Sequence, residues 1–102
     1  MMNVTITRRC QSRINSIREY IEQNFYPEYG RAFEDDVIRT ISLLEDNPDL
    51  GIEAFNSLNR PNIRKILCAN HHHYIYYRRG KNVCEILSVR HTLMDIRSPR
   101  QL

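Results

Sequence analysis

Apolar positions in the first half of the chain recur at spacings of three and four residues, which is typical of amphipathic helices. One stripe consists of Cys10, Ile14, Ile17, Ile21 and Phe25. A second follows Pro27 and consists of Tyr29, Phe33, Val37, Ile41 and Leu44, widened by Ala32 and Ile38. Thr7 suits the N-cap of the first helix, Pro27 the first turn of the second, and the run 46–48 its end. We predict an antiparallel helical hairpin with one shared apolar face.

Alternating or continuous apolar runs on either side of this hairpin predict strands. A short one covers residues 3–7, and after a loop at 48–62 three more cover residues 63–68, 71–78 and about 82–91. The segment Arg79-Gly-Lys-Asn82 suits the last hairpin turn. Ile86 and Leu87 are adjacent, so both faces of the last strand carry an apolar residue. This arrangement predicts a central strand that is covered on both sides.

The element order β-α-α-β-β-β indicates an α+β fold, with the N-terminal helical hairpin packed on one face of a twisted antiparallel sheet. The first strand should pair with the sheet after the helices. With 102 residues, we predict a single domain over residues 1–102, with freedom in the last residues from about 97.

The chain has no stretch near the roughly 18 apolar residues of a membrane helix, and its N-terminus lacks the apolar core of a signal peptide. We therefore expect a cytoplasmic protein without a membrane partner. The three cysteines, Cys10, Cys68 and Cys84, are odd in number and widely spaced. This pattern predicts buried free thiols rather than a disulfide or a metal site.

Positive charge is concentrated in the second part of the chain. The net charge is +3, and the residues from Arg60 onward include nine Lys or Arg against two acids. The first 59 residues hold six basic and ten acidic residues. The basic part suits an anionic partner, either nucleic acid or an acidic protein. The alternative is a solvated sheet edge that carries Arg and Lys.

Two polar clusters have a structural and a chemical interpretation. The run 71–73 is three histidines, but no Cys or acid lies at a recognisable metal-ligand spacing, so we favour a polar strand surface and expect no metal and no cofactor. Tyr74, Tyr76 and Tyr77 could stack on nucleic-acid bases. Tyrosines in strands more often have half-buried rings that pack against the core while their hydroxyls contact water, and we favour this packing role.

Candidate chemistry lies at the exit of the last strand, in Arg90 and His91. We expect Arg64 on the uncovered sheet face near these two residues, where it could hold a phosphate or an acidic side chain. His91 could be a general acid or base near neutral pH, although a histidine after a strand is more often structural. The chain has no Gly-rich phosphate loop, GxSxG or HExxH motif.

Several short sequence pieces occur in a fixed order over nearly the whole chain. They are Val4-Thr-Ile-Thr7, Ile14-x-x-Ile17-x-x-Tyr20-Ile21, Ala32-Phe33, Ile41-x-x-Leu44, Asn47-Pro48-x-x-Gly51, Ile63-Arg64-Lys65, His73-Tyr74-x-Ile-Tyr-Tyr77 and Ile86-Leu87-x-Val-Arg-His91, with Asp95 close behind. In this order, and with these loop lengths, the chain resembles the RelE/ParE superfamily, the toxins of bacterial type II toxin–antitoxin modules.

The resemblance implies the fold predicted above and a cognate antitoxin that wraps an extended or helical segment around the toxin. The basic C-terminal half would favour an acidic segment. RelE-like members are ribosome-dependent nucleases that cut mRNA, and they need cations around the scissile phosphate and a proton-transfer group. ParE-like members poison DNA gyrase and are not hydrolases.

The ending Val89-Arg-His91, followed by Met94-Asp95, is more similar to the ParE side. The Lys-rich segment of RelE-like nucleases is also absent, since residues 53–62 contain a single basic residue, Arg60. We therefore predict a gyrase inhibitor whose target-binding residues are Arg64, Arg90, His91 and Arg97, with residues 92–102 as its contact surface. The alternatives are an mRNA endonuclease that uses Arg64, Arg90 and His91 on the ribosome, and a divergent member that only binds an antitoxin.

Overall fold

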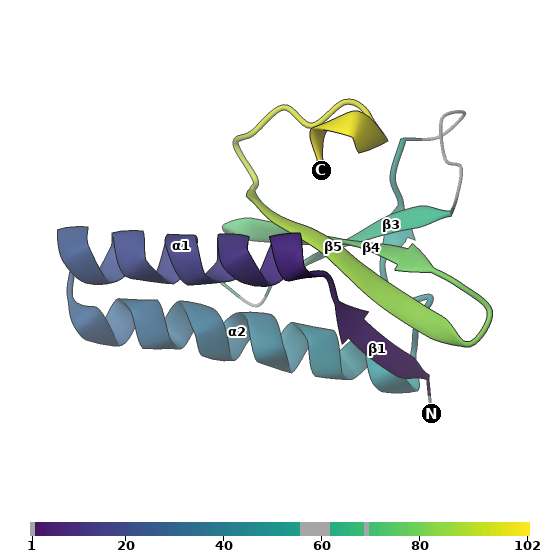
Figure 1. Cartoon of the computed structure of the whole chain (residues 1–102), viewed down its shortest axis with the longest axis horizontal. Coiled ribbons are helices and arrows are strands. Elements are labelled where there is room, and N and C mark those ends of the chain that lie inside the picture. The colour runs from purple at the N-terminus through teal and green to yellow at the C-terminus, as the bar shows by residue number, and fades with distance from the viewer. Residues whose placement is uncertain (1, 56–61, 69) are drawn as a thin grey trace.

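The computed structural model describes residues 2–55, 62–68 and 70–102. The elements in chain order are β1 (Asn3–Ile6), α1 (Arg8–Asn24), α2 (Pro27–Asp46), β2 (Ile52–Glu53), β3 (Ile63–Leu67), β4 (His73–Arg79), β5 (Val83–His91) and the 3₁₀ helix η2 (Pro99–Gln101). They form three layers: the helical hairpin, the sheet, and the C-terminal segment on the other side of the sheet (Figure 1).

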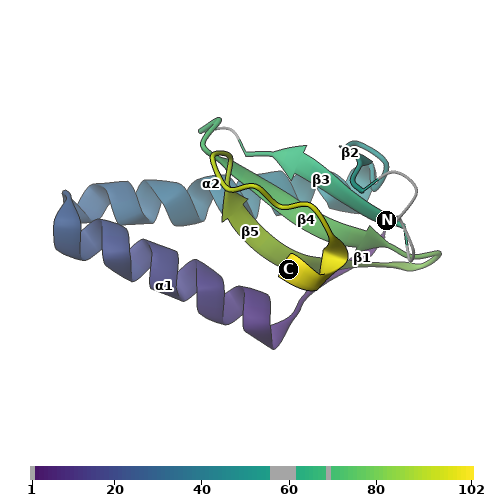
Figure 2. The same ribbon diagram turned by 90° about the horizontal axis from the view of Figure 1, so that it is seen from above.

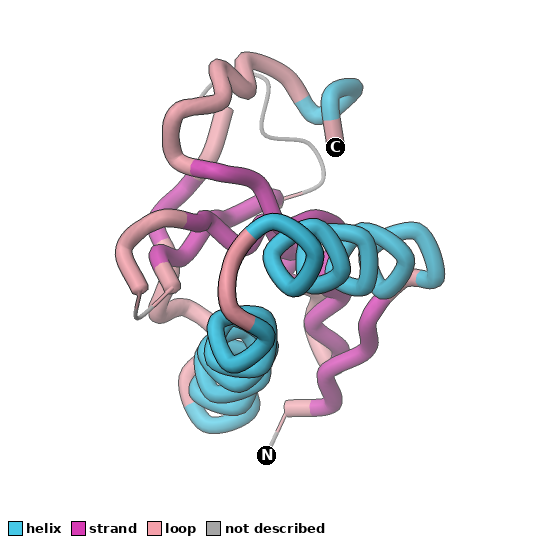
Figure 3. The backbone as a smooth tube through the Cα atoms, turned by 90° about the vertical axis from the view of Figure 1, so that its left-hand side faces the viewer, coloured by secondary structure: helices cyan, strands magenta, loops and turns pink. Residues whose placement is uncertain are grey.

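The helical hairpin begins and ends where the sequence predicts. The Thr7 hydroxyl caps α1 by accepting the N–H of Cys10 at 3.0 Å, and Pro27 opens α2. The two helices lie side by side when seen from their joined end (Figure 3), and Arg18 bonds Glu34 across them at 2.8 Å. Gly30 permits their close approach, because a Cβ there would lie 2.6 Å from Cγ of Glu22.

The sheet has the strand order β1-β5-β4-β3-β2. It is mixed rather than wholly antiparallel, because β1 runs parallel to β5, with Asn3 opposite Val83. The two-residue strand β2 pairs with β3 inside the segment predicted as a loop. The prediction that the last strand is central is confirmed, since β5 lies between β1 and β4, with Ile86 in one core and Leu87 in the other.

A β-bulge in β5 changes which side chains face which layer. Tyr76 lies opposite Ser88 and Tyr77 opposite Ile86, so Leu87 is the extra residue. An extra residue resets the strict alternation of faces along a strand. Beyond the bulge, Arg90 therefore lies on the face away from the helices and His91 on the helix side.

The sheet has a core on each face. The larger core joins it to the helices and contains Cys10, Ile14, Phe33, Val37, Ile41, Leu44, Cys68, Ile75, Tyr77, Cys84, Ile86 and Val89. The smaller one, on the opposite face, contains Ala54, Ile63, Tyr76 and Leu102, flanked by Phe55, Tyr74, Leu87 and Ile96. The C-terminal segment (residues 92–102) thus packs against the sheet, running across β5 in the view from above (Figure 2).

The C-terminal segment is held by one side chain in particular. Oε1 of Gln101 accepts the backbone N–H groups of Arg97 and Ser98, and its Nε2 donates to the carbonyl of Asp95. The residues from about 97, for which the sequence predicts freedom, therefore have defined contacts.

Four predicted members of the apolar stripes lie outside the cores, and Ala32 is one of them. Phe25, Tyr29 and Ile38 are 60%, 54% and 56% exposed. Phe25 and Tyr29 lie near the tip of the hairpin, which extends beyond the end of the sheet, so they have no layer to pack against (Figure 1). Ile38 lies in the middle of α2 and is exposed to solvent there. The cysteine prediction is confirmed, because all three are free and buried. Tyrosine packing is also confirmed, since Tyr76 and Tyr77 are buried.

Strand β4 begins at His73, two residues later than predicted. His71 adopts a positive φ of 61°, and Oδ1 of Asn70 accepts the N–H of His72 at 2.8 Å, so the preceding residues form a turn. In the part of the chain that the structure describes, no helix is long and apolar enough to cross a membrane.

Candidate functional site

Arg90 is a buried cation at the end of β5. Its side chain lies on the sheet face covered by the C-terminal segment and is 8% exposed. Nε donates to Oγ of Ser88 at 2.9 Å, and Nη2 donates to the carbonyl of Gln101. Both acceptors are neutral. Burial lowers the pKa of Arg90, and the nearby charges of Arg13 and Arg9 lower it further.

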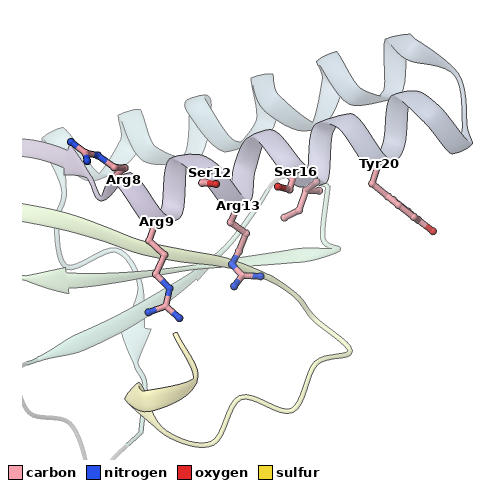
Figure 4. A pocket seen from close by; sticks show the side chains of 7 residues that line it. Arg8, Arg9, Ser12, Arg13, Ser16 and Tyr20 are labelled. Carbon is pink, nitrogen blue, oxygen red and sulfur yellow. The ribbon is translucent and has the colours of Figure 1, made fainter.

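Arg9 and Arg13 come from α1 and lie one helical turn apart, so they share a face of the helix. Their side chains point toward the C-terminal segment, while that of Arg8 points the other way (Figure 4). Arg9 is exposed and Arg13 is half-buried. Among the described residues, no carboxylate lies within ion-pair distance of Arg9, Arg13 or Arg90. We call these three residues the arginine cluster.

The position of this charge is unfavourable for α1 itself. The first turn of α1 holds Arg8 and Arg9 and no acidic residue. The N-terminus of a helix carries partial positive charge, so acidic side chains stabilise it and basic ones do not. The stability of the helix therefore does not account for the arginines at this end.

A shallow groove that is open to solvent runs along α1, with a volume of about 760 Å³. It is lined by Arg8, Arg9, Ser12, Arg13, Ser16, Ile17 and Tyr20 (Figure 4). The arginines lie at one end, and Ile17 and the ring of Tyr20 lie at the other. This arrangement suits a peptide segment with an acidic and an apolar part.

Arg64 does not lie where the sequence analysis expects it. Arg64 is paired with Tyr77 of β4. The ring of Tyr77 lies in the larger core, between the sheet and the helices, so Arg64 is on the same face. Nη1 of Arg64 donates to the carbonyl of Gly51 at 2.7 Å, and Nε lies 3.8 Å from Asp49. The sheet thus separates Arg64 from Arg90. The neighbouring residue, Lys65, is on the other face, with its ammonium 4.5 Å from the ring centre of Tyr74.

His91 belongs to a group of histidine rings on the helix side. It lies opposite His73, with ring centres 5.3 Å apart, and stacks on His72 at 6.3 Å. Its Nδ1 accepts the N–H of Leu93 at 3.1 Å, so the ring stabilises the turn after β5. Burial lowers the pKa of His73 to about 4, helped by the charges of His91 and His72.

The four predicted site residues therefore do not converge. Arg97, the fourth, is exposed and bonds Asp95 at 2.6 Å on the C-terminal segment. Arg90 is instead close to Arg9 and Arg13, which the sequence analysis missed. The available signal was the pair of arginines in the first turn of α1, against the helix dipole. Among the residues described, no three His, Cys, Asp or Glu side chains gather as a metal site.

Comparison with known proteins identifies the class of this fold. A chain of the chromosomal ParDE toxin–antitoxin system from P. aeruginosa superposes with a TM-score of 0.74 and 16% identity, over 89% of this chain and 96% of that chain. The two chains therefore share a fold.

Sequence similarity then gives the family. Toxin ParE1 of Caulobacter vibrioides is 29% identical over 93 residues, which cover 91% of this chain and 92% of the relative. The family model for the ParE toxin of the type II toxin–antitoxin system parDE matches residues 4–96. The chain therefore belongs to the ParE toxin family, and the ParE-like resemblance is confirmed.

Proposed function

We propose that the chain is the toxin of a type II toxin–antitoxin module, that it stops growth by poisoning DNA gyrase in the cytoplasm, and that a cognate antitoxin neutralises it. Family membership supports the toxin role. The separation of Arg64, Arg90 and His91 is the observation that favours gyrase poisoning over cleavage of mRNA.

Cleavage of a phosphodiester requires cations around one phosphate and a proton acceptor within hydrogen-bond reach of the attacking group. Arg64 and Arg90 lie on opposite faces of the sheet and cannot contact one phosphate. His91 is separated from Arg90 by the strand itself, and its Nδ1 already accepts a backbone N–H. This geometry supports an inhibitor that binds its target without hydrolysing it.

The turn after β5 is the proposed gyrase contact within the C-terminal segment. Leu93 is 88% exposed and Met94 is 48% exposed, and the exposed Arg97 follows. Two adjacent apolar side chains at the tip of a turn are suited to insertion into a partner surface. Arg97 can add a charged contact at its rim.

The function is tested with purified protein in two assays, supercoiling by DNA gyrase and mRNA cleavage on translating ribosomes. We expect inhibition of supercoiling and intact mRNA. The double variant Leu93→Ser, Met94→Ser should lose inhibition by about tenfold or more, as expected for central contacts in an interface. The matched control Ile38→Ser, Leu43→Ser removes exposed apolar side chains from α2 and should inhibit normally.

Point variants are preferable to truncation, because deleting the C-terminal segment also removes Leu102 from the smaller core. Codon-associated cuts in mRNA with unaffected gyrase would replace this proposal by the nuclease function. Inactivity in both assays would leave only antitoxin binding. Equal inhibition by the wild type and the Leu93/Met94 variant would exclude the turn as the contact.

A further inference from the structure

Arg13 and Arg90 of the arginine cluster differ from the other partly buried arginines that the structure describes. Each of those has an acidic partner: Arg18 bonds Glu34 at 2.8 Å, Arg78 bonds Glu85 at 2.8 Å, Arg79 bonds Asp49 at 2.9 Å, and Arg64 lies 3.8 Å from Asp49. The cluster holds three guanidinium groups and, within the described residues, no carboxylate at ion-pair distance.

This arrangement is unfavourable for the free chain. A buried charge is usually paired, because removing it from water is costly. Among the residues that the structure describes, Arg90 has two acceptors, both neutral, and the charges of Arg9 and Arg13 add repulsion. An anion placed between these side chains would offset both effects through charge-assisted hydrogen bonds.

The residues that line the groove indicate which kind of anion it binds. A single-stranded nucleic acid is typically bound by cations that track the backbone, with several aromatic rings for successive bases. Here the cations gather at one end, and the other end offers Ile17 and one ring, Tyr20. A peptide with a carboxylate at one end of a short apolar stretch matches this order.

We infer that Arg9 and Arg13, backed by Arg90, bind an acidic side chain of the antitoxin, whose neighbouring apolar residues lie along Ile17 and Tyr20. This inference rests on the proposed function and locates the partner on this chain. The arginine cluster then contributes to the affinity for the antitoxin and also fixes the position of the antitoxin segment along the groove. A segment shifted along the groove would place an apolar residue over the arginines and leave them desolvated and unpaired.

The test uses the protein encoded by the adjoining gene as the antitoxin probe and calorimetry at about 0.1 M salt. We expect the double variant Arg9→Gln, Arg13→Gln to weaken binding by about tenfold or more. The control Arg31→Gln, Arg39→Gln removes the same charge from exposed positions on α2 and should change affinity by less than about twofold. The thermal midpoint of the free Arg9/Arg13 variant should stay equal or rise, because repulsion around Arg90 is relieved.

The possible results distinguish a failure of the arginine-cluster site from a failure of the proposed antitoxin partnership. If the wild type does not bind the probe, the proposed antitoxin partnership fails. If the wild type and the Arg9/Arg13 variant bind equally, the partnership stands and this site is wrong. A lower thermal midpoint would show a structural role instead. Loss of binding to a labelled DNA duplex, with unchanged antitoxin binding, would assign the cluster to nucleic acid.

Discussion

His73 shows how a single ring at the edge of the larger core couples folding to pH. It packs against Phe33, with ring centres 4.9 Å apart, and faces His91 at 5.3 Å. Burial there disfavours the charged imidazolium, which gives the folded chain a pKa of about 4 at this site. The unfolded chain has the ordinary value of about 6.5 and binds the proton first.

This difference makes stability depend on pH. We expect the free energy of unfolding to keep its full value above about pH 6.5 and to fall by roughly 2 kcal/mol toward pH 4. This fall is smaller than the full pKa difference would give, because the ring of His73 is partly exposed to solvent. Urea unfolding at pH 7 and pH 4.5 measures the change. His73→Gln should remove most of it, whereas the exposed His72→Gln should not. Equal pH dependence in the wild type and His73→Gln would contradict this account.

At the scale of elements, the helices could be predicted because their signals are local. The spacing of apolar residues, the cap at Thr7 and the proline at 27 lie within the elements they define. The faces of β5 could not be predicted in the same way. Strict alternation places Arg90 on the face of Ile86, and only the bulge at Leu87 moves it to the other side.

The candidate site was predicted in part for the same reason. Arg90 was identified from its place at the strand exit, but its neighbours Arg9 and Arg13 are distant in sequence and meet it only after the sheet and helices pack. Arg64 was assigned to the wrong face, because a single arginine followed by a lysine does not show which of the two faces the helices.

The connection between α2 and β3 depends on the hydroxyl of Tyr77. This group donates to the carbonyl of Pro48 at 2.7 Å and accepts the N–H of Gly51 at 3.0 Å. Tyr77→Phe leaves both backbone groups without this partner, and we expect a loss of about 1–3 kcal/mol in the free energy of unfolding. The control Tyr20→Phe alters a ring that is 60% exposed and should have little effect. Chemical denaturation compares the two, and equal stability would show that water replaces the hydroxyl.

At the scale of the whole molecule, the C-terminal segment completes the three-layer structure. Deleting residues 97–102 removes Leu102 from the smaller core and uncovers Tyr76 and Ile63. Burial of one leucine side chain is worth about 1.5–3 kcal/mol. The deletion also removes the Gln101 carbonyl that accepts from Arg90, so we expect a loss of at least that size and stronger binding of an apolar dye. Replacing the exposed Arg97 and Arg100 by Gln should leave both measurements unchanged. A truncated chain with wild-type stability would show that the segment is dispensable for the fold.

The parallel pairing of β1 with β5 has a consequence for how this protein is made. Asn3 lies opposite Val83, so β1 finds its partner only when β5 has been synthesised. Closing so long a loop is slow compared with forming the helical hairpin, whose contacts are local. The turn after β5 and the complete arginine cluster are therefore assembled only after β5 has been synthesised. A growing chain that still lacks β5 carries neither surface.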